Sequence, residues 1–197
     1  MMDINAVWKE NVILADAAYI DAVAFDLSVN FERMLERRMP KADMARWVDC
    51  IALDGGLRPL QGDEQRETLV ILIYPKEKKT LDNFLPGGLA DELNGKSFSD
   101  HLGEFTFYSY PVEDLVDTAG FFLEALQVIA DEKAVKNLMV IPDCEKYGDS
   151  IRSFLKMVKG KQATLFAMNP QLPGPYRQEI LGYSVMNAMG IRGDEFK

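Results

Sequence analysis

The sequence contains very few of the residues that build the commonest catalytic and structural centres. Among 197 residues there is one histidine, His101, and there are two cysteines, Cys50 and Cys144. A single histidine excludes a zinc site made of several histidines and leaves one candidate base for a Ser-His-Asp triad. Two cysteines make no disulfide framework, which favours a reducing compartment. We therefore expect a cytoplasmic protein.

Long apolar runs and an excess of basic residues are also missing. No apolar run approaches the roughly 20 residues that span a bilayer, and the first ten residues lack the basic and apolar regions of a signal peptide. The formal net charge is −9 at pH 7, which opposes unspecific attraction to RNA and to anionic membranes. We expect no membrane partner, and RNA is a possible but disfavoured one.

Apolar runs alternate with stretches of helical periodicity along most of the chain. The predicted strands are 12–16, 69–74, 104–110, 138–141 and 164–168. The predicted helices are 19–35, 42–53, 112–129, 149–158 and 176–189, with two short ones near 81–85 and 89–93. This alternation predicts a three-layer α/β/α sandwich with about five mostly parallel strands. We expect one domain over residues 1–170 and a C-terminal helical extension, 171–197, that packs on this domain or on a partner.

Acidic residues follow several of the predicted strands. Asp16 ends the first strand, Asp143 and Glu145 follow the fourth, and Asp114 lies where the third gives way to a helix. The carboxyl ends of parallel strands share one edge of a sheet, so Asp16, Asp143 and Glu145 converge if the first and fourth strands are neighbours. Clustered carboxylates suit Mg²⁺ or Mn²⁺, which can activate water for attack on a phosphodiester. These three residues are the catalytic candidates, and all four are candidate metal ligands.

Each of these acids also fits a purely structural role. Asp16 suits the N-cap of the first long helix, and Asp143 and Glu145 suit the positive end of the helix dipole that follows them. Asp114, or Asp117 beside it, suits the cap or first turn of the next helix. The sequence leaves both interpretations open at each position.

The acidic turn at 143–145, together with the order of elements around it, resembles a known family. The chain reads Val-Ile-Leu-Ala-Asp up to Asp16 and Leu-Met-Val-Ile-Pro-Asp-Cys-Glu at 138–145, and then a helix, Lys-Gly-Lys and Thr-Leu-Phe-Ala. This order of elements over 12–168 resembles the PIN/NYN-type ribonuclease domains. The resemblance implies a metal-binding acidic site in which Asp16 is the first-strand aspartate, and Asp143 with Glu145 takes the place of a late Asp-x-Asp pair. The whole chain also resembles an uncharacterised bacterial family with no assigned activity.

Two classes of function follow. Pro142 stands where the PIN/NYN family commonly has a small residue, and Glu145 stands where it has aspartate. Together with the acidic net charge, these differences favour a non-catalytic PIN/NYN-like module that binds a protein partner or associates with itself. The alternative is a Mg²⁺- or Mn²⁺-dependent ribonuclease or phosphodiesterase that uses the acidic cluster.

Overall fold

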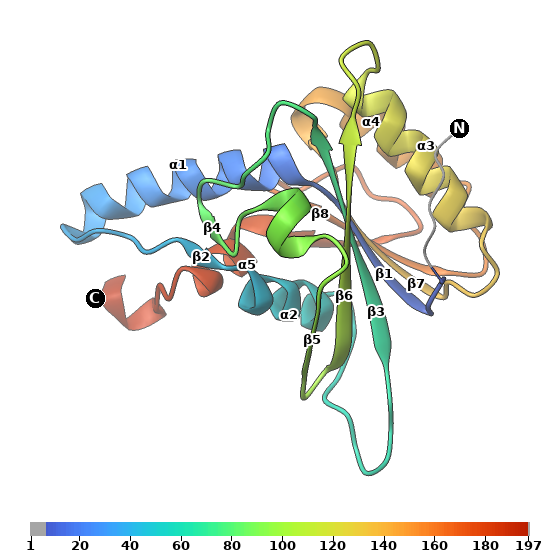
Figure 1. Ribbon diagram of the computed structural model, residues 1–197, viewed down its shortest axis with the longest axis horizontal. Helices are drawn as coiled ribbons and strands as arrows, with labels where there is room; N and C mark the ends of the chain where they lie inside the picture. Colours follow the sequence, from blue (N-terminus) through green and yellow to red (C-terminus); the bar gives the residue numbers. More distant parts are fainter. Residues whose placement is uncertain (1–6, 197) are drawn as a thin grey trace.

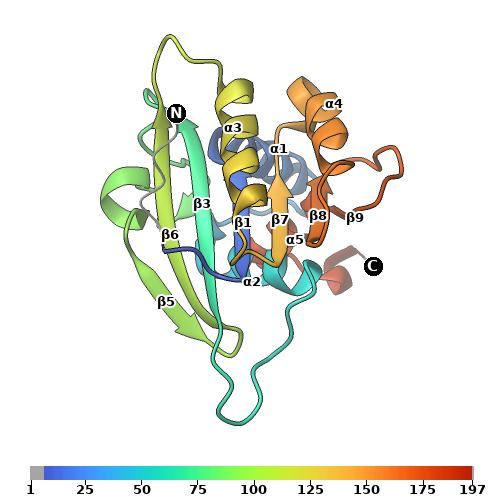
Figure 2. The ribbon, with the colours of Figure 1, turned by 90° about the vertical axis from the view of Figure 1, so that its right-hand side faces the viewer.

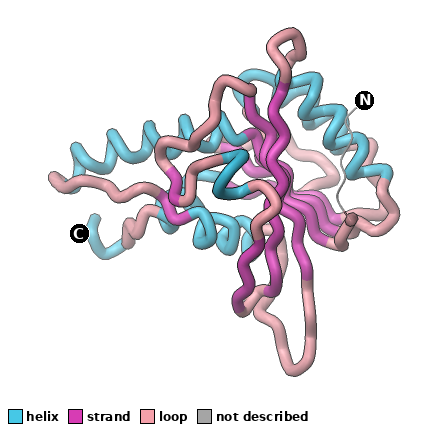
Figure 3. The backbone as a smooth tube through the Cα atoms, viewed as in Figure 1, coloured by secondary structure: helices cyan, strands magenta, loops and turns pink. Residues whose placement is uncertain are grey.

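The fold is built on a mostly parallel β-sheet with helices on both faces (Figures 1 and 3). The computed structural model describes residues 7–196. Its strands are β1 (Asn11–Asp16), β2 (Ala42–Asp43), β3 (Glu67–Pro75), β4 (Phe84–Leu85), β5 (Ser97–Asp100), β6 (Gly103–Val112), β7 (Asn137–Ile141), β8 (Gln162–Ala167) and β9 (Arg177–Ile180). Its helices are α1 (Ala17–Leu35), α2 (Met44–Asp54), α3 (Thr118–Asp131), α4 (Cys144–Leu155) and α5 (Leu181–Ala188), with a π-helical turn η1 (Leu89–Leu93) and a 3-10 turn η2 (Gly193–Phe196). Within these residues no helix combines the length and the apolar character needed to cross a membrane.

The main sheet has seven strands in the order β5-β6-β3-β1-β7-β8-β9, and β2 pairs with β4 in a separate small sheet. All neighbours in the main sheet are parallel except β5 and β6. Counted along the chain, its six parallel strands stand in the order 3-2-1-4-5-6, the doubly wound order of Rossmann folds. The expected mostly parallel α/β architecture is confirmed, with seven strands in the main sheet instead of about five.

Alternate side chains of the buried strands pack into two cores on opposite faces of the sheet. In β1, Ile13 and Ala15 belong to one core, and Val12 and Leu14 belong to the other. The first core is covered by α1, α2 and α5, and the second by α3 and α4. Figure 2 looks onto the face of α3 and α4, with the other three helices behind the sheet. Burial on both faces requires apolar residues at nearly every position, which is why these strands appear as apolar runs in the sequence.

The two edge strands of the main sheet were not predicted. β5 and β9 are short and polar, and their side chains are exposed or only half-buried, so no apolar run marks them. β9 occupies the first part of the helix predicted at 176–189, and only Leu181–Ala188 is helical. Pairing with β8 fixes the extended backbone of β9. The prediction failed because edge strands depend on neighbouring backbone more than on local sequence.

The segment 80–99 also differs from its prediction. Instead of a helix at 81–85, Phe84 and Leu85 form β4, which pairs with β2. Phe84 is fully buried, and its ring packs edge-on against Trp47 with centroids 5.7 Å apart. This burial favours the extended backbone over a local helix. The second short helix predicted here is the π-helical turn η1.

Candidate functional site

The carboxyl ends of β1 and β7 meet where the winding of the sheet changes direction. β1 pairs in parallel with β3 on one side and with β7 on the other, so the first and fourth predicted strands are indeed neighbours. Asp16 is the last residue of β1, and Asp143 follows shortly after the end of β7. Doubly wound sheets bind their ligands in the crevice at this switch point.

A cavity of about 480 Å³ lies at this edge, and we call it the switch-point pocket. Its lining residues come from the starts of α1, α3 and α4 and from the end of β3: Asp16, Ala18, Tyr19, Ala22, Pro75, Asp117, Thr118, Ala119, Asp143, Lys146 and Tyr147. A pre-formed cavity with a few convergent polar groups is the usual form of a small-ligand site. We therefore treat this pocket as the candidate site.

Asp16, Asp117 and Asp143 each cap the helix that follows them. Their carboxylates accept hydrogen bonds from backbone N–H groups in the first turns of α1, α3 and α4, with donor–acceptor distances between 3.1 and 3.3 Å. The structural role that the sequence allowed is therefore present at all three positions. Because the capped helices converge on one pocket, the same three carboxylates also line it.

A hydrogen bond between Asp16 and Tyr147 joins β1 to α4 at the pocket. The Tyr147 hydroxyl donates to Asp16 Oδ2 at 2.6 Å, and Asp16 is only 4% exposed. Burial raises the pKa of Asp16 above its ordinary value, and the hydrogen bond from Tyr147 opposes that rise. Burial also raises the pKa of Tyr147, so its phenol stays protonated and acts as the donor.

Helix α4 begins earlier than the sequence predicted. The predicted start is Asp149, whereas the helix starts at Cys144 and leaves helical geometry at Tyr147, with φ −138° and ψ 24°. A first turn therefore precedes the regular helix, and the acidic turn is a helix N-terminus rather than a loop. Burial raises the pKa of the Cys144 thiol to about 11, which keeps the sulfur protonated at neutral pH and argues against a nucleophile.

The other predicted site residues lie outside the pocket. Glu145 is exposed on the first turn of α4 and does not line the cavity. Asp114 lies before α3, where its carboxylate pairs with Lys76 Nζ at 2.9 Å. Within residues 7–196, no three side chains of the metal-binding types His, Cys, Asp and Glu are grouped so that they could hold an ion. Asp16 and Asp143 therefore line the pocket together, whereas Glu145 and Asp114 do not line it.

Lys146 and Tyr147 are among the pocket residues that the sequence did not indicate. Lys146 brings an ammonium group 3.7 Å from Asp143 Oδ2. Tyr147 reaches Asp16 across 131 residues of chain, and no local motif records such a contact. The only available signal was their position in the first turn after a strand-end aspartate.

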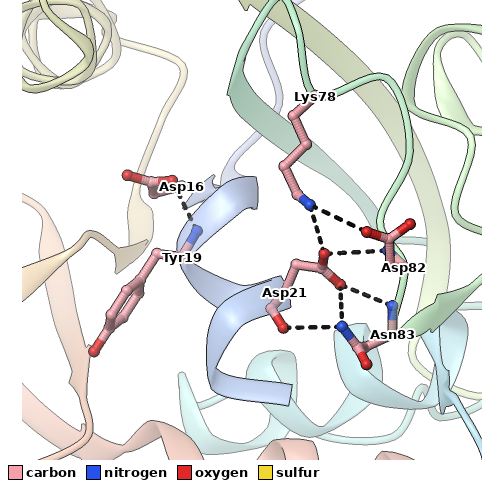
Figure 4. A network of polar contacts seen from close by, with 6 residues as sticks. All are labelled: Asp16, Tyr19, Asp21, Lys78, Asp82 and Asn83. Atoms are coloured by element: carbon pink, nitrogen blue, oxygen red, sulfur yellow. Dashed lines mark hydrogen bonds and ion pairs between the residues drawn. The ribbon is translucent and has the colours of Figure 1, made fainter. Parts of the chain in front are cut away.

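Asp21, in the second turn of α1, anchors the loop that follows β3 (Figure 4). It is 3% exposed and accepts hydrogen bonds from the backbone N–H groups of Asp82 and Asn83 at 3.1 and 2.9 Å. Lys78 Nζ pairs with the same carboxylate at 2.7 Å. Figure 4 shows Asp16 on one side of the start of α1 and this network on the other. The network holds the loop against α1.

Comparison with known proteins places the chain in a family but assigns it no activity. No curated protein and no solved structure matches the chain. Residues 5–196 match the family described as "Family of unknown function (DUF6621)". The match covers nearly the whole chain, and the protein therefore belongs to this family of unknown function.

Proposed function

We propose that this protein is a non-catalytic binding module with a PIN/NYN-like order of elements, and that its ligand presents a cationic group to the switch-point pocket. The observation that carries the proposal is the buried carboxylate of Asp16 in a pre-formed cavity at the topological switch point. The ligand class follows from the charge of the lining.

The lining has three carboxylates and one ammonium group, that of Lys146. The Lys146 side chain is mostly exposed and lies near Asp143, so it offsets little of the charge around Asp16. Burial disfavours the ionised form of Asp16, and a positive charge nearby would favour that form. The Tyr147 hydroxyl fixes one oxygen of Asp16, which orients the carboxylate before any ligand arrives. An ammonium or guanidinium group suits this setting.

Two further observations favour a ligand site over the other functions considered. Helix α5, which the sequence offered as a self-association surface, packs against α2 and α1 of its own chain. For a metal-dependent nuclease, only two of the four candidate ligands, Asp16 and Asp143, line the pocket.

The test is a titration of ¹⁵N-labelled protein with n-butylammonium, followed by NMR. We expect saturable shift changes confined to the amides around the pocket, with a dissociation constant of roughly millimolar, as suits so small a ligand. In Asp143→Asn the affinity falls at least threefold, because asparagine keeps the cap but removes the charge. In Asp43→Asn it is unchanged, because Asp43 caps α2 in the same way away from the pocket.

Two outcomes would overturn the proposal. The first is the absence of saturable binding, or equal binding of uncharged n-butanol, since either result removes the role of charge. The second comes from a parallel titration with Mn²⁺. Site-specific Mn²⁺ binding that Asp143→Asn abolishes, accompanied by RNA cleavage, would favour the metal-dependent nuclease instead.

A further inference from the structure

A second cavity adjoins the switch-point pocket on the exposed side of α1. It has a volume of about 470 Å³ and is lined by residues of α1 and of the loop after β3, among them Asp21, Phe25, Lys78 and Asp82. Ala18 and Ala22 line both cavities. The two cavities therefore adjoin along these two alanines, and we treat them together as one groove, the α1 groove, with the alanines on its floor.

Small residues keep the floor of the α1 groove low. Ala18, Ala22 and Phe25 recur at helical spacing and so share one face of α1. A larger side chain at Ala22, which is exposed, would stand between the two cavities without disturbing the core. The groove is open because the side chains of Ala18 and Ala22 are small.

The wall of the groove is pre-organised. The loop after β3 supplies Lys78, Asp82 and Asn83, and the buried carboxylate of Asp21 holds all three in place (Figure 4). A binding partner would meet a fixed wall and would not have to order this loop, and that lowers the entropic cost of association.

The two ends of the groove differ in chemistry. At the β-sheet end, the switch-point pocket presents the carboxylates of Asp16, Asp117 and Asp143. At the other end, Phe25 is 55% exposed, and Val29 one turn further is 39% exposed. Phe25 and Val29 therefore form a small exposed apolar surface at this end. A ligand that fits both ends has a cationic group and an apolar group.

Charge also favours a basic ligand along the whole groove. Its lining contains five carboxylates, those of Asp16, Asp21, Asp82, Asp117 and Asp143, and two ammonium groups. Both lysines already pair with these carboxylates, Lys78 with Asp21 at 2.7 Å and Lys146 with Asp143 at 3.7 Å. The surplus of negative charge is complementary to a basic segment.

We propose that the α1 groove binds an extended segment of a partner protein, with a lysine or arginine head in the switch-point pocket and an apolar side chain against Phe25. The inference rests on the proposed cation site and extends it to a peptide. Ala18 and Phe25 are two helical turns apart, about 10 Å along α1. At about 3.3 Å per residue, three residues of extended chain cover this distance. The basic and apolar residues of the partner are therefore about three positions apart.

The experiment uses two synthetic peptides, because either chain direction suits the groove. They are acetyl-Gly-Lys-Gly-Gly-Leu-Gly-amide and acetyl-Gly-Leu-Gly-Gly-Lys-Gly-amide, titrated into the ¹⁵N-labelled full chain. We expect one of them to bind about fivefold tighter than n-butylammonium. Replacing its leucine with serine should remove that gain, because the contact with Phe25 is apolar.

Protein variants locate the binding. Phe25→Ser should weaken the peptide about fivefold and leave n-butylammonium unchanged. Ala22→Arg should abolish peptide binding, because it fills the floor and repels the lysine. Asn30→Arg adds the same charge to an exposed position of α1 that lines neither cavity, and it should bind like the wild type. Unchanged amide dispersion shows that each variant is folded.

The outcomes separate this inference from the proposal beneath it. If n-butylammonium binds and neither peptide binds more tightly, the cation site stands and the groove is refuted. If peptide binding persists in both Phe25→Ser and Ala22→Arg, the groove is likewise refuted. If n-butylammonium does not bind, the cation site fails and this inference fails with it. A wild-type dimer in sedimentation equilibrium that Ala22→Arg dissociates would make a second copy the occupant and overturn the peptide proposal.

Discussion

Tyr147→Phe tests whether the Asp16–Tyr147 contact holds the candidate site together. The substitution removes one oxygen and keeps the ring, which packs against Phe122 with centroids 5.5 Å apart, so no cavity is created. Asp16, 4% exposed, keeps its hydrogen bond from Tyr19 N–H at 3.1 Å and loses the one at 2.6 Å. Hydrogen bonds to charged groups contribute about 1.5–3 kcal/mol. We expect a loss of unfolding free energy of about 2 kcal/mol at neutral pH.

The pH dependence of this loss distinguishes a charged acceptor from a neutral one. Burial raises the folded-state pKa of Asp16 above its unfolded value, and the hydrogen bond from Tyr147 lowers it. A group with a raised folded pKa contributes stability that is complete below the unfolded pKa and is lost as pH rises through the folded pKa. Tyr147→Phe raises the folded pKa further, so the variant loses more stability than the wild type as pH rises. Its deficit is therefore larger at pH 7 than below pH 4.

Urea unfolding of the wild type and of Tyr147→Phe at pH 7 and at pH 3.5 measures the loss of unfolding free energy and its dependence on pH. Equal m-values for the two proteins would confirm that the variant has the same folded and unfolded states. A deficit below about 0.5 kcal/mol at both pH values would refute the view that this hydrogen bond matters, since it is less than a typical net hydrogen bond. A larger deficit at low pH would refute the assignment of Asp16 as the charged acceptor.

Three further predictions concern other carboxylates. Burial and, after it, a hydrogen bond with Asp100 raise the pKa of Asp49 to about 7. Asp49 should therefore add about 2 kcal/mol to the unfolding free energy below pH 4, after allowance for its partial exposure. This contribution should be lost as the pH rises through 7. Urea unfolding at pH 4.5 and 8 should show a flatter pH dependence for Asp49→Asn, and equal slopes would contradict this. Asp143→Ala should lose about 1 kcal/mol of unfolding free energy in the same assay, because it removes the cap of α4. Asp143→Asn, which keeps the cap, should stay within a few tenths of a kcal/mol of the wild type. Equal losses in the two variants would exclude capping as the cause. Asp21→Ala should lose about 3 kcal/mol of unfolding free energy, because it leaves Lys78 and two partly buried backbone amides without their acceptor. Hydrogen exchange should then accelerate at Asp82 and Asn83, and unchanged protection would show that another contact holds the loop.

The candidate site was predictable only in part. Asp16 and Asp143 were found because carboxyl ends of parallel strands share an edge, and the pairing of β1 with β7 makes them neighbours. Glu145 was expected beside them, but α4 starts at Cys144 and its first turn leaves Glu145 exposed. The sequence also did not show that Ala18 and Ala22 would line two adjoining cavities, since the second wall comes from a loop far along the chain.

The sequence by itself determined the elements whose residues are buried regardless of their partners. Apolar runs marked β1, β3, β7 and β8, because a strand covered on both faces has little choice of residue. Apolar periodicity marked the long helices α1 and α3 in the same way.

Only the tertiary structure decided the features that depend on distant partners. β5 and β9 are strands because neighbouring backbone offers hydrogen bonds to polar segments, and β4 is extended because Phe84 is buried against Trp47. Tyr147 belongs to the candidate site because the fold brings it to Asp16 across 131 residues. Local sequence fixes local conformation and burial, whereas a pocket is made of contacts between segments that no local pattern connects.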